Sequence, residues 1–180
     1  EAKDRLWILL DGLKKGMAPA VRKLGVTPDM LRWIAKELQA RPKKKGERND
    51  TLFDATMLNA ALQHMFFFLC RASECGNSSG VDLEKIVRGC DVALKREGLP
   101  CSSEADEVSR QFRKTKADQQ AFGSSRTHYR TGDALVCPVQ SMEAFRSWAP
   151  ERFGKGSEAG LPLFRWSNGA VLKREEIQPM

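Results

Sequence analysis

An arginine followed three residues later by a glutamate is the pair whose types and spacing best suit chemistry. Arg71 and Glu74 stand in FFFLCRASEC, residues 66 to 75, where a strongly apolar run passes into a polar turn. A guanidinium delivered from an apolar helix requires a partner, because a buried charge is costly unless it is paired or binds an anion. Arg71 is therefore a candidate for anion binding. A local ion pair with Glu74, three residues on, is the alternative.

Basic residues gather in two further segments. The first is RPKKKGERN, residues 41 to 49, which is polar and contains both Pro and Gly, as is typical of a solvated loop. The second is RKTKADQQAFG, residues 113 to 123, where alternate residues of an extended chain point to the same side. Both segments offer cations that could position a nucleic-acid backbone without reading its sequence. The candidates are Lys43, Lys44, Lys45, Arg113 and Lys114.

The overall charge favours a partner that carries many phosphates. The 180 residues have a formal net charge of +7. Each Lys or Arg that neutralises a phosphate releases a condensed counterion, and this release drives binding to nucleic acids. Basic proteins also bind acidic proteins, so charge favours nucleic acid without establishing it.

Membrane-spanning, disulfide-bonded and metal-binding classes are not favoured. The longest apolar run, Met65 to Cys70, is far shorter than a bilayer requires. The five cysteines are scattered without a CxxC pair, which indicates reduced thiols in an intracellular compartment. His64, Cys70 and Cys75 lack the paired spacing of metal ligands, so we expect them to pack in the core and predict no metal.

Apolar periodicity predicts a mainly helical domain with a small sheet. With 41% apolar and 29% charged residues, the chain suits one globular domain. Thr27 and Pro28 open a helix that ends near Ala40, and residues 52–69 are apolar on nearly every side, as in a helix at the centre of a domain. We expect strands at residues 86–95, 108–116 and 125–130, and a helix at 138–150. The predicted class is α+β, mostly helical with a three-stranded antiparallel sheet.

An ordered series of motifs resembles the catalytic domain of tyrosine recombinases of the phage-integrase family. FFFLCRASEC is similar to the family's first arginine box, in which an apolar helix runs into an Arg-x-Ser-Glu turn. RKTKADQQAFG, followed by LVCPV at residues 135 to 139, is similar to the Lys-Thr-Asp-Gln hairpin and the Leu-Cys-Pro-Val segment of mobile-element recombinases. VTPDMLRWI, residues 26 to 34, resembles the entry to the catalytic domain in DIRS-type and crypton recombinases, and PLFRWSNG, residues 162 to 169, resembles the later connector.

This resemblance implies a role in DNA recombination and DNA integration, with double-stranded DNA as the partner. It implies that Arg71 grips a non-bridging oxygen of the scissile phosphate, with Glu74 supporting the site from behind. It implies that Lys116 protonates the leaving 5′ oxygen of DNA, with Lys114 as a possible substitute. The sequence departs from the family at Ala117, where Thr is usual. The complete enzyme would form a 3′-phosphotyrosyl intermediate with no metal or nucleotide cofactor.

The resemblance also implies domain boundaries and an incomplete active site. Residues 1–18 would end a preceding DNA core-binding domain or linker, and residues 19–180 would form the recombinase domain, incomplete at its C-terminus. The family's His-x-x-Arg box and nucleophilic tyrosine have no match in the chain, and its one tyrosine, Tyr129, is expected to be structural. For the complete enzyme, the resemblance implies self-association into a recombination synapse, and a nuclear location if the host is eukaryotic.

Two other hypotheses stay open at this point. A non-catalytic DNA-binding or interaction module could retain the same fold without the missing catalytic residues. A basic helical protein could also carry these motifs by coincidence, and a lack of salt-dependent DNA affinity would favour that hypothesis.

Overall fold

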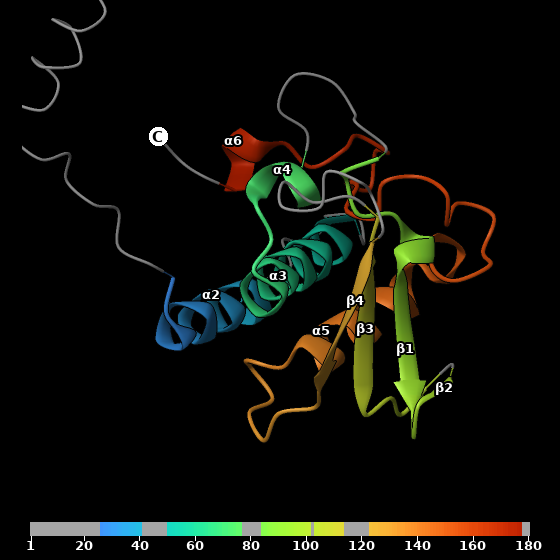
Figure 1. Cartoon of the computed structure of the whole chain (residues 1–180). Helices are drawn as coiled ribbons and strands as arrows, with labels where there is room; N and C mark the ends of the chain where they lie inside the picture. The colour runs from blue at the N-terminus through green and yellow to red at the C-terminus, as the bar shows by residue number, and fades with distance from the viewer. Residues whose placement is uncertain (1–25, 41–49, 77–83, 102, 114–122, 178–180) are drawn as a thin grey trace, which may run out of the picture.

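The computed structural model describes residues 26–40, 50–76, 84–101, 103–113 and 123–177. They form helices packed with a small antiparallel sheet (Figure 1), so the predicted α+β class is confirmed. The predicted boundary at residue 18 lies outside the described residues. The elements in chain order are α2 (Pro28–Ala40), α3 (Asp50–Phe68), α4 (Ala72–Cys75), η1 (Gly89–Asp91), β1 (Val92–Arg96), β2 (Leu99–Pro100), β3 (Glu107–Phe112), β4 (Ser124–Tyr129), α5 (Pro138–Trp148), η2 (Pro150–Arg152) and α6 (Arg174–Ile177).

Helix α3 runs through the centre of the domain, as its apolar sequence predicts. It packs against α2 and α5, and its last turn reaches the sheet, where the rings of Phe68 and Phe112 lie 6.5 Å apart. Gln63 fixes the helix to the chain before α5 by donating a hydrogen bond of 2.8 Å to the carbonyl of Leu135. Within the described residues, neither α3 nor any other helix combines the length and apolar character needed to cross a membrane.

Helix α2 is held on the domain by one buried edge and one ion pair. Thr27 caps its first turn by accepting a hydrogen bond of 3.3 Å from the backbone of Met30, as its position before Pro28 predicts. Leu31 is buried. At the next residue, the Arg32 guanidinium donates from Nε and Nη2 to the carboxylate of Asp133, at 3.0 and 2.6 Å. This contact joins α2 to the loop that precedes α5.

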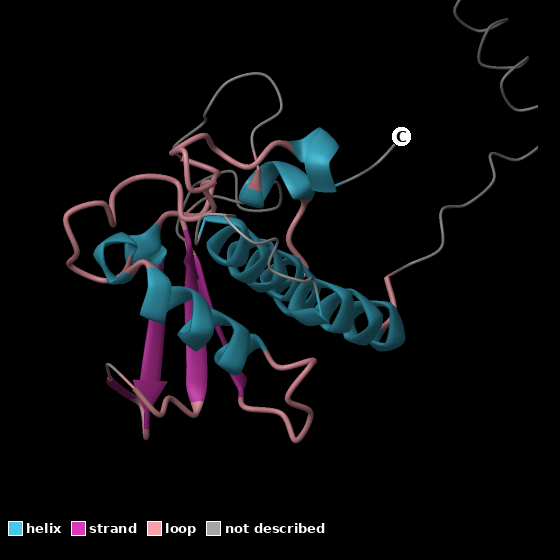
Figure 2. Ribbon diagram, turned by 180° about the vertical axis from the view of Figure 1, so that it is seen from behind, coloured by secondary structure: helices cyan, strands magenta, loops and turns pink. Residues whose placement is uncertain are grey.

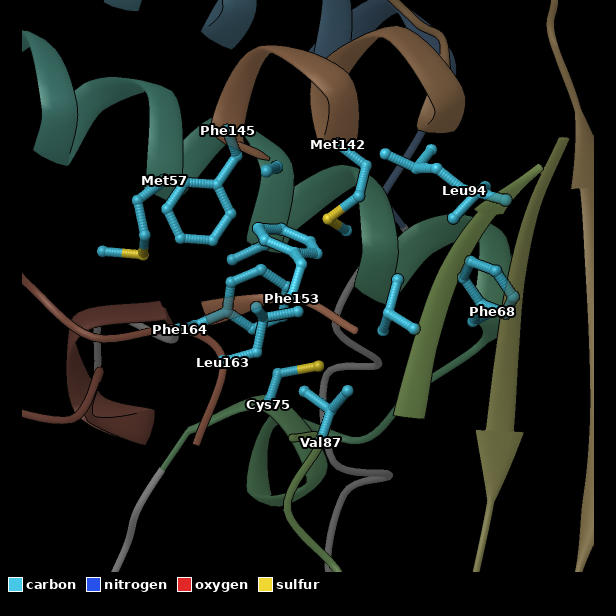
Figure 3. Close-up of a cluster of buried hydrophobic side chains, with 14 of the residues drawn as sticks. Met57, Phe68, Cys75, Val87, Leu94, Met142, Phe145, Phe153, Leu163 and Phe164 are labelled. Atoms are coloured by element: carbon cyan, nitrogen blue, oxygen red, sulfur yellow. The ribbon is translucent and has the colours of Figure 1, made fainter. Parts of the chain in front are cut away.

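The core gathers around aromatic rings from α3, α5 and the segment after η2 (Figure 3). Phe145 of α5 stacks on Phe164 with ring centroids 6.1 Å apart, and it meets the edges of Phe53 and Phe153 at 5.9 and 5.6 Å. Aromatic pairs with these separations add to the stabilisation that burial of their surface provides. Phe145 therefore links the central helix to the C-terminal segment.

The sheet has strand order β2-β1-β3-β4, with every neighbouring pair antiparallel. The sequence predicted three strands, and this number is wrong because the sheet has one more, the short edge strand β2. A turn with Gly98 at φ 79 reverses the chain, so that Pro100 lies opposite Lys95 at the sheet edge. Proline is tolerated at a sheet edge because its missing N–H is not needed for a further ladder.

One face of the sheet is apolar and covered, and the other is polar. Val108 and Phe112 of β3 belong to the core, and Arg110 between them points to the same side. Gln111 on the opposite side is exposed, while Ser109 hydrogen-bonds Thr127 of β4 at 2.8 Å. Seen from behind in Figure 2, α5 crosses the sheet, consistent with its contacts to β1, β3 and β4. The alternation along β3 therefore aims one arginine into the interior.

The strand predicted at residues 86–95 begins later than expected, because its first half is used for other contacts. Residues 89–91 form η1, and the strand itself runs from Val92 to Arg96. Before η1, Val87 pairs through its backbone with Leu163, whose N–H donates to the Val87 carbonyl at 2.9 Å. Gly89 lies against the backbone of Arg152, where a Cβ would sit 1.4 Å from the carbonyl oxygen. Close backbone approach, which alternating hydrophobicity does not reveal, sets the start of the strand.

This approach makes Gly89 intolerant of a side chain. Because the obstructing atom is a backbone oxygen, Gly89→Ala must displace η1 or η2, and we expect a loss of about 1–3 kcal/mol in the free energy of unfolding. Chemical denaturation followed by circular dichroism measures this loss. Gly160→Ala is the matched control, since a Cβ there meets nothing within 4 Å. Equal stability of the two variants would contradict the packing described here.

Candidate functional site

Arg71 lies on the surface at the start of α4, not at a buried helix end. Helix α3 ends at Phe68, and Leu69 turns the chain with φ 53. Arg71 is then extended, with φ −71 and ψ 151, and its side chain is 60% exposed. The expectation that this guanidinium would be buried is therefore wrong, since the left-handed turn at Leu69 carries the chain out of the core before the arginine is reached.

Glu74 holds the backbone and the side chain of Arg71 together. Its Oε2 accepts a hydrogen bond of 3.3 Å from the Arg71 N–H, and its Oε1 lies 3.8 Å from Nη1 of the same residue. The Glu74 side chain is only 14% exposed. An ion pair with so exposed an arginine contributes little stability. Most of the Arg71 side chain remains accessible to a ligand.

An apolar pocket with a volume of about 850 Å³ lies next to Arg71. It is formed between α2, the last turns of α3 and the start of α4, and α4 and α6 are neighbours in both views (Figures 1 and 2). Its basic lining residues are Arg71 and Arg174, and Cys70 also contributes to its wall. The exposed guanidinium is therefore set at the boundary between an apolar surface and solvent.

Arg113, which directly follows β3, is held by an ion pair and a backbone hydrogen bond. Its Nη2 donates to the carboxylate of Asp91 and to the carbonyl of Ile86, both at 2.8 Å. Asp91 is itself buried, and also accepts a hydrogen bond of 2.8 Å from the Arg88 N–H. The predicted DNA-contact residue thus ties β3 to η1 through an internal ion pair. The remaining predicted lysines, Lys43, Lys44, Lys45, Lys114 and Lys116, lie outside the described residues.

The hairpin root and α4 are neighbours. A small cavity of about 10 Å³ is lined by Glu74 from α4, by Asp91 from η1 and by Phe112 and Arg113 from the end of β3. Arg113, the last described residue before the predicted lysines, therefore borders the same cavity as Glu74, the ion-pair partner of Arg71. This juxtaposition joins two segments that are well separated in the sequence.

A buried arginine that the sequence analysis did not single out lies behind this surface. Arg110 is 2% exposed, and its Nη1 donates to Nε2 of His64 at 3.2 Å and to the sulfur of Cys70. Its guanidinium also lies 4.4 Å from the ring centre of Phe112. The signal was available, because strand alternation places Arg110 on the same face as Val108 and Phe112.

The buried groups beside Arg110 have altered proton affinities. Burial lowers the pKa of His64 well below its ordinary value, and the positive charge of Arg110 lowers it further. Because Arg110 only donates, His64 accepts at Nε2 and carries its proton on Nδ1, which has no hydrogen-bond partner among the described residues. His64 is thus a neutral core residue. Among the described residues there is no cluster of His, Cys, Asp and Glu suited to holding a metal.

Comparison of the chain with protein-family models, with curated proteins and with solved structures gave no match. The functional assignment therefore depends on the geometry given above together with the motifs in the sequence.

His64 predicts a loss of stability in mild acid. Its pKa is lowered in the folded state from the ordinary value of 6.5, so below that pH the unfolded chain binds the extra proton. Stability should be fully present above pH 6.5 and should fall as the pH decreases, by at most about 1.4 kcal/mol per pH unit for this one group. Denaturation of wild type and His64→Gln at several pH values measures the slope.

The variant should show a shallower slope than wild type. Some slope should remain, because burial also lowers the pKa of His128. An unchanged slope in His64→Gln would show that the histidine titrates alike in the folded and unfolded chains.

Proposed function

We propose that this chain is the DNA-binding part of a tyrosine recombinase, and that Arg71 binds a phosphate of the DNA backbone. One observation carries the proposal: the Arg71 side chain is 60% exposed, and its guanidinium lies 3.8 Å from the largely buried carboxylate of Glu74. Preorganised donors stabilise charge that develops on a ligand, because they need not reorient when it forms. In a recombinase this charge develops on the phosphorane during strand exchange.

The hairpin supports the proposal by its position. Arg113, at the end of β3, borders the same cavity as Glu74, so the hairpin emerges beside α4. We propose that Lys116 reaches from it toward the phosphate bound by Arg71 and acts as the general acid, with Lys114 as the alternative. The fixed ion pair of Arg113 with Asp91 would then anchor the hairpin instead of contacting DNA, which revises the role first assigned to Arg113.

The remaining parts of the proposal concern the DNA backbone and the complete enzyme. Lys43, Lys44 and Lys45 would add non-specific phosphate contacts, for which the net charge of +7 is suited. The nucleophilic tyrosine would be supplied from outside these 180 residues, so the chain itself would bind DNA without cleaving it. Synapsis by self-association, and nuclear action in a eukaryotic host, belong to the same proposal. It invokes no metal and no nucleotide.

Arg71→Ala should weaken DNA binding and reduce its dependence on salt. Loss of one phosphate contact lowers the magnitude of the slope of log K against log salt by about 0.9. Fluorescence anisotropy with a labelled duplex, measured over a range of salt concentrations, gives both the affinity and the slope. Arg71→Lys should retain the slope but lose affinity, because a lysine keeps the charge without the planar fork.

Arg96→Ala is the matched control for this measurement. Arg96 is also exposed and paired, at 2.7 Å with Glu104, but it ends β1, whose arrowhead lies far from α4 in Figure 1. We expect its binding curve to follow that of wild type. If the Arg71 and Arg96 variants lost DNA affinity equally, binding would reflect general charge attraction, and the proposal of a phosphate site at Arg71 would be contradicted.

The fragment proposal has a separate test on nicked DNA. The chain alone should form no covalent phosphotyrosyl product, because Tyr129 is an exposed residue at the end of β4 and matches no nucleophile position. Denaturing gel electrophoresis of the reaction would reveal such a product. Efficient product formation by this chain would overturn the proposal that its nucleophile lies elsewhere.

A further inference from the structure

The apolar pocket beside Arg71 has a wall from each of two helices. Met30 and Ile34 line it from α2, and Leu62, Met65 and Phe66 line it from α3. Residues three or four apart on a helix share one face, so each helix offers the pocket a continuous apolar surface. The pocket volume of about 850 Å³ lies within the range of about 300–1,000 Å³ that is usual for small-molecule sites. The space is therefore suited to a small ligand with an apolar part.

The apolar side chains at the mouth of this pocket remain in contact with solvent. Val26, Met30 and Leu69 all line it, and they are 55%, 48% and 80% exposed. Leu69 also has a φ of 53, a left-handed conformation that is unfavourable for a residue with a Cβ. An exposed leucine gains no burial to offset this strain, and strained positions of this kind cluster at ligand sites. A ligand that covers Leu69 would supply the missing burial.

The charged groups of the pocket are basic. Among the described lining residues the charged side chains are Arg71 and Arg174, at the starts of α4 and α6, and none of the lining is Asp or Glu. Arg71 lies 3.8 Å from Glu74, which is beyond hydrogen-bonding distance, and its side chain is 60% exposed. Ser73 adds a hydroxyl to the same lining. Since a guanidinium binds a carboxylate through paired N–H donors, this side of the pocket is complementary to an anion.

We propose that the pocket binds a single-chain fatty acid, with its carboxylate held by Arg71 and Ser73 and its alkyl chain between α2 and α3. Charge complementarity selects the head group, and the open apolar walls select the chain. A wholly apolar ligand would bring no anion to the guanidinium, and a small inorganic anion would leave the apolar mouth uncovered. The inference does not rest on the proposed function, because its test contains no DNA.

Isothermal titration calorimetry with octanoate, decanoate and dodecanoate, each below its micelle concentration, tests this proposal. Each pair of added methylene groups should tighten binding about tenfold, because the longer chain buries more apolar surface. Dodecylamine carries the same alkyl chain on a cation, and it should bind at least about tenfold more weakly than dodecanoate. Equal affinities for the two dodecyl ligands, an affinity independent of chain length, or no binding at all would overturn the proposal.

The head-group contact is tested by Arg71→Ala. The loss of a hydrogen bond between charged groups should weaken dodecanoate binding about tenfold or more. Arg96→Ala is the matched control, because Arg96 is similarly exposed, at 56% against 60%, and does not line the pocket. It should bind dodecanoate as wild type does, and equal losses in the two variants would contradict a carboxylate site at Arg71.

The chain contact is tested by Met30→Gln, which places a polar amide in the apolar wall and should weaken dodecanoate binding severalfold. Leu161→Gln is its control, because Leu161 is 45% exposed and Met30 48%, and Leu161 does not line the pocket. Both positions are exposed, so both variants should keep the wild-type circular dichroism spectrum. Unchanged dodecanoate affinity in Met30→Gln would contradict an alkyl chain against α2.

The pocket and the proposed DNA site share Arg71, so dodecanoate should compete with duplex DNA in the anisotropy assay. Saturating dodecanoate should weaken DNA binding about as much as Arg71→Ala does. If dodecanoate binds and DNA affinity is unchanged, the DNA role of Arg71 is contradicted and the fatty-acid site stands. If dodecanoate does not bind while Arg71→Ala still weakens DNA binding, the fatty-acid site alone is contradicted.

Discussion

The central constraint on this fold is a helix with no polar side. Because α3 is apolar around its circumference, every direction from its axis needs a covering layer. The covering elements are α2, which precedes it in the chain, and three later elements: the inner face of the sheet, α5, and the aromatic segment that contains Phe164. The same requirement explains why the sheet is one-sided. Its apolar face is needed to cover α3, and its polar face is left to solvent.

The end of this helix determines where the site lies. A long buried helix must release its chain to the surface somewhere, and here the release is abrupt, through the left-handed backbone of Leu69. The next residues form a short helix whose first turn presents Arg71 outward and turns Glu74 back toward it. The positions of Arg71 and Glu74 are thus determined by how α3 terminates. The hairpin reaches the same neighbourhood because β3 packs its final ring, Phe112, on Phe68 of α3.

Elements with strong periodic or capping signals could be predicted from the sequence. The helix from Pro28 to Ala40 was predicted at both ends, since Thr27 and Pro28 give a local starting signal. The helix after Cys137 was equally clear, because its proline fixes the first turn. Features that depend on distant backbone contacts were not predictable. Neither the late start of β1 nor the exposure of Arg71 has a local signature. The inward position of Arg110 does have one, because the alternation of β3 places it on the face of Val108 and Phe112.

The pairing of Val87 with Leu163 has a consequence for how the chain acquires its structure. These two residues are joined through their backbones, yet nearly half of the chain separates them. Contacts of such high sequence separation require closure of a long loop before any stabilisation is gained, which slows folding. During synthesis, the strand that follows Val87 leaves the ribosome well before the segment that secures it. The nascent chain therefore passes through a stage in which the Val87 carbonyl lacks its backbone partner, Leu163.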